Sequence, residues 1–121
     1  MISFELSGET PSKKNSRINT RSGRSFPNKK FIQWHDEKLL ELSSFRGGSL
    51  PIDCPVSLKV VFVHGDERRR DSDNQLSSVL DLLVDAGILK DDGWRIVRRV
   101  SVENTFERKR PRAIIAIEGI E

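Results

Sequence analysis

The chain has 121 residues, of which 36% are hydrophobic and 32% are charged, and its 21 lysine and arginine residues against 18 aspartate and glutamate residues give a net charge of +3. We expect one domain over residues 1–121, able to bury roughly two thirds of its unfolded surface. A single cysteine excludes an internal disulfide, and the sequence shows neither an apolar run of about 18 residues nor a signal-peptide pattern. We therefore expect a cytoplasmic protein rather than a secreted or membrane-spanning one.

The first 45 residues predict a strand, a long loop and a helix. Residues 2–6 alternate between apolar and polar side chains, which is typical of a half-buried strand. Residues 8–29 are rich in glycine, proline, serine and basic residues, and they indicate a long basic loop or arm. Residues 30–45 place Phe31, Trp34 and several leucines at near-helical spacing, which predicts a helix whose aromatic residues pack in the core.

The middle of the chain predicts a buried strand followed by an amphipathic helix. Residues 56–63 alternate at first and then become continuously apolar, as in a largely buried strand. An apolar stripe at helical spacing follows it, formed by Leu76, Val79, Leu80, Leu83 and Val84. Asp71 or Asp73 suits the N-cap of this helix, and Gly87 suits its C-terminal end.

Two further strands are expected at residues 95–102 and 112–119, which gives the order β-α-β-α-β-β. Two helices are enough to cover one face of a small sheet. The predicted fold class is therefore α/β (α+β), a two-layer sandwich of two helices on a mixed sheet of about four strands. Because residues 103–111 connect the last two strands, we expect these strands to pair with each other in antiparallel orientation.

Basic residues form three clusters on this small domain. Residues 1–30 hold seven lysine or arginine residues and two glutamates, Arg68, Arg69 and Arg70 are consecutive, and residues 108–112 hold four cations. One such cluster usually makes a solvated surface. Three clusters together favour a polyanionic partner, and nucleic acid in particular.

Aspartates gather in two short segments that flank the second helix. Asp71 and Asp73 precede or begin the helix, and two residues apart in extended backbone they point to the same side. Asp91 and Asp92 follow its end, and spacing alone does not fix whether Asp92 returns to Asp73. If it does, three carboxylates converge, and carboxylate oxygens are the ligands that Mg²⁺ and Mn²⁺ prefer. The alternative interpretation is a helix cap at the first pair and a turn at the second.

The ordered motifs resemble the RusA family of Holliday junction resolvases. The resemblance rests on Arg68-Arg69-Arg70-Asp71-Ser72-Asp73-Asn74, then on Asp81, Leu82, Ala86-Gly87 and Asp91-Asp92. It covers residues 56–102 well. Residues 11–15, Pro-Ser-Lys-Lys-Asn, also resemble the segment after the first strand of the family, with one extra residue before the asparagine. The combination in this order is more specific than any single motif.

The resemblance implies a function. RusA-like proteins are homodimeric, Mg²⁺-dependent endodeoxyribonucleases that bind four-way (Holliday) junctions and make paired nicks in DNA recombination and repair, with Mn²⁺ as a substitute metal. The catalytic and metal-binding carboxylates of the family match Asp71, Asp73 and Asp92. Asp91 is a further candidate metal ligand and Asp81 a secondary candidate. Such a protein would be associated with the nucleoid through its DNA.

The same resemblance and the basic clusters suggest which residues contact DNA. The candidates are Lys13, Lys14, Asn15, Arg17, Arg68, Arg69, Arg70 and Ser77. Ser77 marks a departure, because the family commonly carries a lysine at this place, one helical turn after the second aspartate. A lysine there would stabilise charge that develops at the phosphate, and a serine supplies no cation.

Two other classes of function stay open on the sequence. A non-catalytic protein that binds branched DNA or RNA would share the basic clusters and use the aspartates as caps. A protein-interaction module would carry the charges as a solvated surface and would show no salt-dependent binding of DNA.

Overall fold

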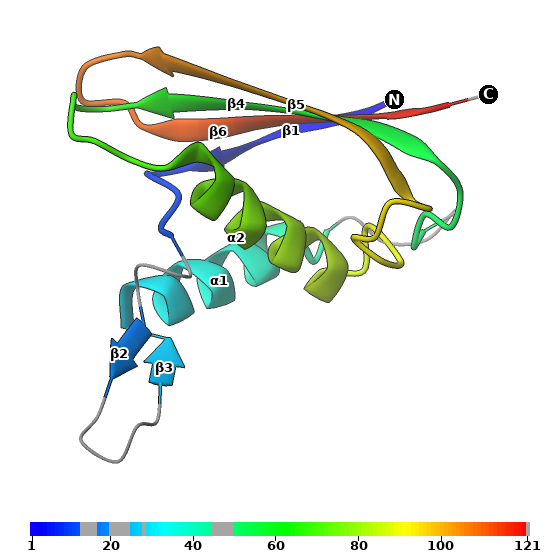
Figure 1. Cartoon of the computed structure of the whole chain (residues 1–121), viewed down its shortest axis with the longest axis horizontal. Helices are drawn as coiled ribbons and strands as arrows, with labels where there is room; N and C mark the ends of the chain where they lie inside the picture. Colours follow the sequence, from blue (N-terminus) through cyan, green and yellow to red (C-terminus); the bar gives the residue numbers. More distant parts are fainter. Residues whose placement is uncertain (13–16, 20–24, 28, 45–49, 121) are drawn as a thin grey trace.

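The computed structural model describes residues 1–12, 17–19, 25–27, 29–44 and 50–120. Figure 1 shows two layers, a curved sheet and a pair of helices that cover one of its faces. The strands are β1 (Ile2–Ser7), β2 (Arg17–Asn19), β3 (Ser25–Pro27), β4 (Val56–His64), β5 (Val97–Phe106) and β6 (Arg112–Gly119). The helices are α1 (Lys29–Leu42) and α2 (Ser72–Asp85). The predicted α+β sandwich with its order of strands and helices is thus confirmed.

The main sheet has the strand order β1-β6-β4-β5. Strand β6 runs antiparallel to both β1 and β4, whereas β5 runs parallel to β4. The expected antiparallel pairing of the last two strands is therefore wrong, because β4 lies between them. The reason is the helical crossover: α2 carries the chain back to the start of the sheet, so the next strand must run parallel to β4. Residues 107–111 then pass the end of β4 to its other side (Figure 1).

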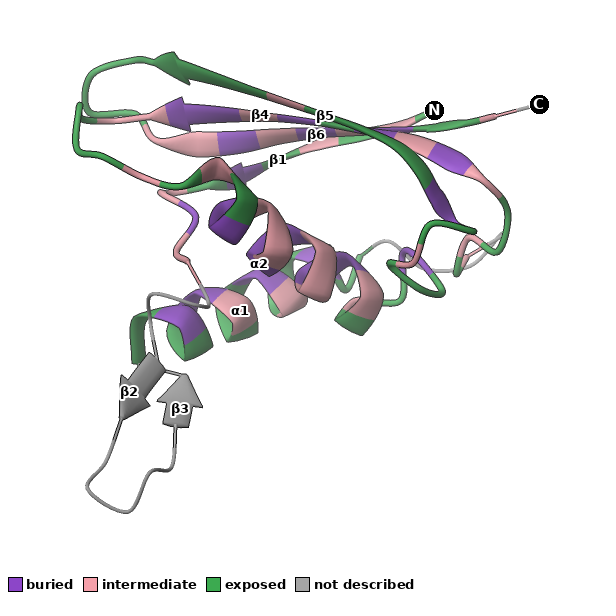
Figure 2. Cartoon of the chain, viewed as in Figure 1, coloured by how far each residue is buried: buried purple, intermediate pink, exposed green. Residues whose placement is uncertain are grey.

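The core lies between the sheet and the helices. Alternate residues of β4 are buried, Leu58, Val60 and Phe62 among them, as the period of two predicts for a strand with one covered face. The helices contribute Phe31, Trp34, Leu42, Val79, Leu82 and Leu83 to the same core. Figure 2 shows that burial concentrates on the facing sides of the two layers, while the edge strand β5 is largely exposed.

Helix α2 begins and ends at residues that fix its direction over the sheet. Asp71 is the N-cap in an extended conformation (φ −96°, ψ 115°), but its carboxylate makes no capping hydrogen bond. Ala86 is the C-cap and Gly87 follows it with φ 74°, a left-handed conformation that favours glycine. The predicted cap at Asp71 is thus confirmed for the backbone, and its side chain stays available for another role.

The segment predicted as a basic loop or arm contains a short hairpin. Strands β2 and β3 pair in antiparallel orientation, with Ile18 opposite Phe26. The hairpin extends beyond the start of α1, away from the main sheet (Figure 1). Two short strands can pair through their backbone hydrogen bonds without an apolar pattern. Because this segment has few apolar residues, its composition indicated a loop.

Neither helix in the described part of the chain is long and apolar enough to cross a membrane.

The packing of α2 against the sheet predicts a large cost for truncating its core residues. Leu83 is fully buried, so Leu83→Ala should lower the free energy of unfolding by about 2–5 kcal/mol. Leu40 lies on α1 and is 76% exposed, so Leu40→Ala should change it by less than about 0.5 kcal/mol. Urea unfolding followed by circular dichroism measures both. Equal effects of the two substitutions would contradict the packing of the helix layer.

Candidate active site

The three consecutive arginines before α2 have different environments. The side chains of Arg68 and Arg69 are 84% and 93% exposed, whereas that of Arg70 is 18% exposed. The Arg70 guanidinium donates to Asp66 Oδ1 at 2.8 Å. This hydrogen bond, together with one from the backbone N–H of Arg68, lowers the pKa of Asp66 below its ordinary value. Arg70 is therefore held by the protein, and the other two arginines extend toward solvent, where a phosphate could reach them.

Asp71 and Asp73 lie at the N-terminus of α2, directly after these arginines. Both are exposed. The nearest cation to Asp71 in the described residues is Arg69, whose Nη2 lies 3.8 Å from Asp71 Oδ1, and Asp73 has no hydrogen-bond or ion-pair partner there. The N-terminus of a helix favours negative charge. The two carboxylates are thus ionisable acceptors, weakly engaged by the protein, and suited to a hard divalent cation.

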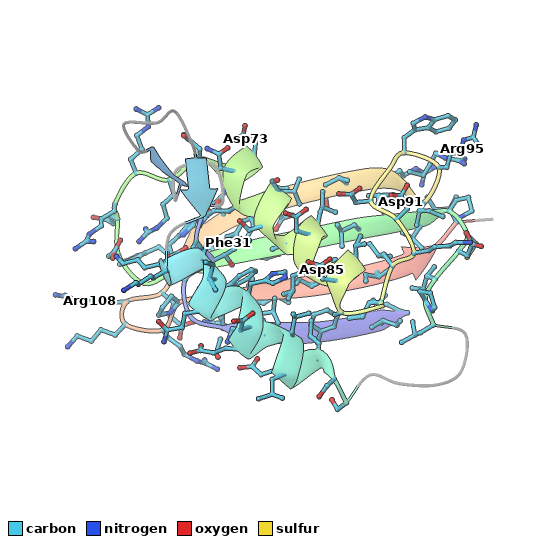
Figure 3. All side chains as sticks on the ribbon, turned by 90° about the horizontal axis from the view of Figure 1, so that it is seen from below. Phe31, Asp73, Asp85, Asp91, Arg95 and Arg108 are labelled. Carbon is cyan, nitrogen blue, oxygen red and sulfur yellow. The ribbon has the colours of Figure 1, made fainter. Side chains whose placement is uncertain are left out.

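Asp91 and Asp92 lie at the opposite end of α2 from this pair. Figure 3 shows Asp73 and Asp91 near the two ends of the helix, which has 14 residues and is about 21 Å long. Asp91 Oδ2 accepts a hydrogen bond from the backbone N–H of Gly93 at 3.2 Å, within its own turn. Asp92 is exposed and has no partner among the described residues.

The carboxylates therefore do not converge within one chain. Among the described residues, no three histidine, cysteine, aspartate or glutamate side chains form a group that could hold a metal ion. Asp81 lies halfway along α2 and is half-buried. Asp71 is extended and Asp73 is already helical, so the two do not share one extended segment as the sequence predicted, although both lie at the start of α2. Asp92 lies beyond the other end of the helix.

The other predicted DNA contacts divide between the same end of the molecule and segments that are not described. Ser77 is half-buried in the second turn of α2, and Arg17 belongs to β2. Residues 13–15, with Lys13, Lys14 and Asn15, lie outside the described residues. Arg108, in the third basic cluster, lies at the same end of the molecule as Asp73 (Figure 3).

Glu9 lies at the centre of the polar contacts around the start of α2, and the sequence alone did not indicate it. Its carboxylate lies 3.0 Å from His64 Nδ1, 3.4 Å from Arg70 Nε and 2.9 Å from Gln75 Nε2, which donates to it. It therefore joins the end of β1, the end of β4, the arginine run and α2. A lone glutamate after a strand carries no motif, so only the fold could identify it.

Two further hydrogen bonds fasten the segment after β1 onto α2. Gln75 Nε2 donates to the carbonyl oxygen of Thr10 at 2.7 Å, and Ser78 Oγ donates to that of Pro11 at 2.7 Å. Both donors lie on α2, more than 60 residues away along the chain. The start of the basic arm is thereby fixed beside Asp71.

A second polar connection reaches α2 from the edge strand. His64 Nε2 lies 2.8 Å from Asn104 Oδ1, and Asn104 Nδ2 donates to Ser72 Oγ at 2.8 Å. Ser72 lies between Asp71 and Asp73, so this connection helps to hold the start of the helix in place. The two aspartates are thus presented on a braced backbone rather than on a free loop.

Comparison with known proteins identifies the family to which the chain belongs. The family model described as endodeoxyribonuclease RusA matches residues 8–118. The crossover junction endodeoxyribonuclease RusA of Aquifex aeolicus (strain VF5) is 28% identical over 121 residues, covering 99% of this chain and 93% of that protein. Because the family model spans nearly the whole chain, including both aspartate segments, the chain belongs to the RusA family of endodeoxyribonucleases.

Proposed function

We propose that this protein is a metal-dependent endonuclease that resolves four-way DNA junctions by paired nicks, in recombination and repair of nucleoid DNA in the cytoplasm. The observation that carries the proposal is the exposed pair Asp71 and Asp73 at a helix N-terminus, flanked by Arg68 and Arg69, in a chain of this nuclease family. Residues 1–121 would act as one endonuclease domain, with the segment 8–29 as a DNA-binding arm.

The donor set supports a divalent cation at this position. Asp71 and Asp73 offer carboxylate oxygens that no strong protein contact occupies, which is the ligand chemistry of Mg²⁺ and Mn²⁺. A bound ion would neutralise charge on the scissile phosphate and on the leaving oxygen, and it would activate water for hydrolysis. Asp91 is a further candidate ligand beside Asp92.

A second copy of the chain would complete the carboxylate set. Asp73 and Asp91, the residue before Asp92, lie near opposite ends of α2 (Figure 3). A two-fold axis near the middle of this helix would therefore place Asp92 of the partner subunit beside Asp71 and Asp73. Leu76, Leu80 and Val84 follow one stripe of α2 at the border of the core and are only half-buried there, so they would leave apolar surface for a second copy to cover. Each dimer would hold two equivalent sites, as paired nicking of a two-fold junction requires.

The cations beside the site would position the DNA. Arg68 and Arg69 extend into solvent and would bind phosphates on either side of the cleaved bond. Arg70 would act indirectly, by holding Glu9 and Asp66 and so the loop that carries its neighbours. Ser77 contributes no cation on α2, so charge stabilisation at the phosphate would rest on these arginines and on the helix N-terminus.

Removing the carboxylates tests the site. Asp71→Asn, Asp73→Asn and Asp92→Asn should each abolish cleavage of a labelled four-way junction in Mg²⁺, because an amide replaces an anionic ligand. Junction binding in EDTA should persist, since each change removes negative charge next to a polyanion. Asp36→Asn, an exposed aspartate on α1, is the matched control and should cut normally. Wild-type cleavage rates in the three site variants would refute the assignment.

Binding without cleavage by the wild type in every metal would instead favour a non-catalytic protein that binds branched DNA or RNA.

Mixing two inactive variants tests whether the site is shared between subunits. In a mixed dimer of Asp73→Asn and Asp92→Asn, one site receives both substitutions and the other receives none. Cleavage should therefore return in the mixture, as single nicks from one intact site per mixed dimer. Gel analysis of nicked products after subunit exchange measures this. A mixture as inactive as its components would mean that each site lies within one chain.

Replacing Ser77 on α2 with lysine is expected to raise the activity. Ser77→Lys places a cation one turn after Asp73, so it should raise the single-turnover cleavage rate about tenfold, equivalent to about 1.4 kcal/mol of transition-state stabilisation. Ser77→Ala should leave the rate unchanged. If both substitutions have the same effect, position 77 does not face the reacting phosphate.

A further inference from the structure

A hollow of about 380 Å³ opens beside the proposed catalytic carboxylates. Its walls come from residues 9–12 after β1, from the first turns of α1, from the arginine run and from Gln75 on α2, and Asp71 itself forms part of one wall. Its volume is at the lower end of the range of about 300–1,000 Å³ that is common for ligand pockets. It is therefore large enough to receive part of the substrate next to the bond that is cut.

Three buried polar side chains line this hollow, and each has one polar atom without a hydrogen-bond partner in the described part of the chain. Thr10 is 3% exposed, Trp34 is 7% exposed and Gln75 is 2% exposed. Within the described part of the chain, Thr10 Oγ1, Trp34 Nε1 and Gln75 Oε1 have no hydrogen-bond partner. In this structure each of the three atoms has less than 1 Å² of accessible surface. Buried polar atoms are nearly always hydrogen-bonded, so three exceptions among the residues around one hollow indicate that small side-chain movements expose them to an occupant that completes them.

The three atoms define the chemistry of that occupant. The indole N–H of Trp34 donates, the amide oxygen of Gln75 accepts, and the hydroxyl of Thr10 can do either. The indole ring and Pro11 add apolar surface to the same wall. A nucleobase matches this set, because its edge alternates donors and acceptors and its faces are apolar.

The charges around the hollow favour a nucleobase over a phosphate as its occupant. Glu9, Asp71 and Arg70 line the hollow. Arg70 is already paired with Glu9 at 3.4 Å and with Asp66 at 2.8 Å, so the two carboxylates disfavour an anion inside the hollow. Lys30 and Arg69 also border it, and both are exposed to solvent, where they can meet a backbone phosphate. The arrangement suits a nucleotide whose base enters the hollow while its phosphate stays at the rim.

We propose that this hollow receives one nucleobase, unstacked from the junction next to the phosphate that is cut, and that Thr10, Trp34 and Gln75 read its edge. The inference rests on the proposed nuclease function and deepens it, since it names residues that determine sequence preference. Bases at the branch point of a junction end a stacked arm, so removing one from the stack costs less there than within a continuous duplex.

The test uses four-way junctions that carry 2-aminopurine at single positions around the branch point, because this base becomes brighter when it is unstacked. Binding is measured in EDTA, so that the readout is independent of cleavage. Wild-type protein should brighten the probe at one position and leave the others unchanged. Thr10→Val and Trp34→Phe should reduce that signal at equal occupancy and should weaken the preference among junctions of different sequence by about two- to tenfold, the effect of one lost hydrogen bond.

Two control variants separate reading of a base from a structural role. Thr10→Ser keeps the hydroxyl and should behave as wild type, and Thr105→Val makes the same chemical change as Thr10→Val at an exposed position on β5. Because Thr10 Oγ1 has no partner in the described residues, Thr10→Val should not lower the melting temperature.

The outcomes distinguish this inference from the function on which it rests. If no probe brightens with wild-type protein, or if Thr10→Val and Trp34→Phe keep the wild-type signal and sequence preference, the base assignment is refuted even when junctions are cleaved. If the probe brightens in EDTA and responds to both variants but no metal supports cleavage, the base assignment stands and the nuclease proposal fails.

Discussion

The helical crossover between β4 and β5 is the constraint on which the rest of this structure depends. Because the two strands run parallel, the chain must return across the whole sheet, and α2 makes that return. Residues before α2 are therefore separated from residues after it by the length of the helix. The two aspartate segments lie on either side of this crossover, and Figure 3 shows Asp73 and Asp91 near its two ends. The crossover therefore keeps the two segments apart within one chain.

The N-terminal end of α2 is held in place by a polar network instead of the usual side-chain cap. Asp71 does not cap the helix with its carboxylate. The positions are fixed instead by Glu9, which joins His64, Arg70 and Gln75. This leaves the two aspartates open to solvent on a braced backbone, at a helix N-terminus that favours their negative charge.

Local patterns predicted the elements well, and long-range contacts limited the rest. The alternation in β4 and the stripe on α2 are periodic, so burial of Val60 and Leu83 followed directly. The pairing of β5 was predicted wrongly, because the short connection between β5 and β6 fits a hairpin as well as it fits a passage around the end of β4. The helical crossover makes β5 parallel to β4 and so excludes the hairpin. Thr10 and Gln75 lie 65 residues apart, and neither type of residue signals a binding site. The hollow they share therefore became visible only in the folded chain.

We propose that carboxylates from two subunits form each site, and disulfide trapping tests this proposal most directly. Asp73→Cys and Asp92→Cys are made separately, each with the exposed Cys54 replaced by serine. A disulfide requires Cα atoms about 4.4–6.8 Å apart. A covalent dimer should form under mild oxidation when the two proteins are mixed and exchange subunits, and neither protein alone should give it. A mixture that stays monomeric on a non-reducing gel, while its subunits are shown to exchange, would contradict the shared site.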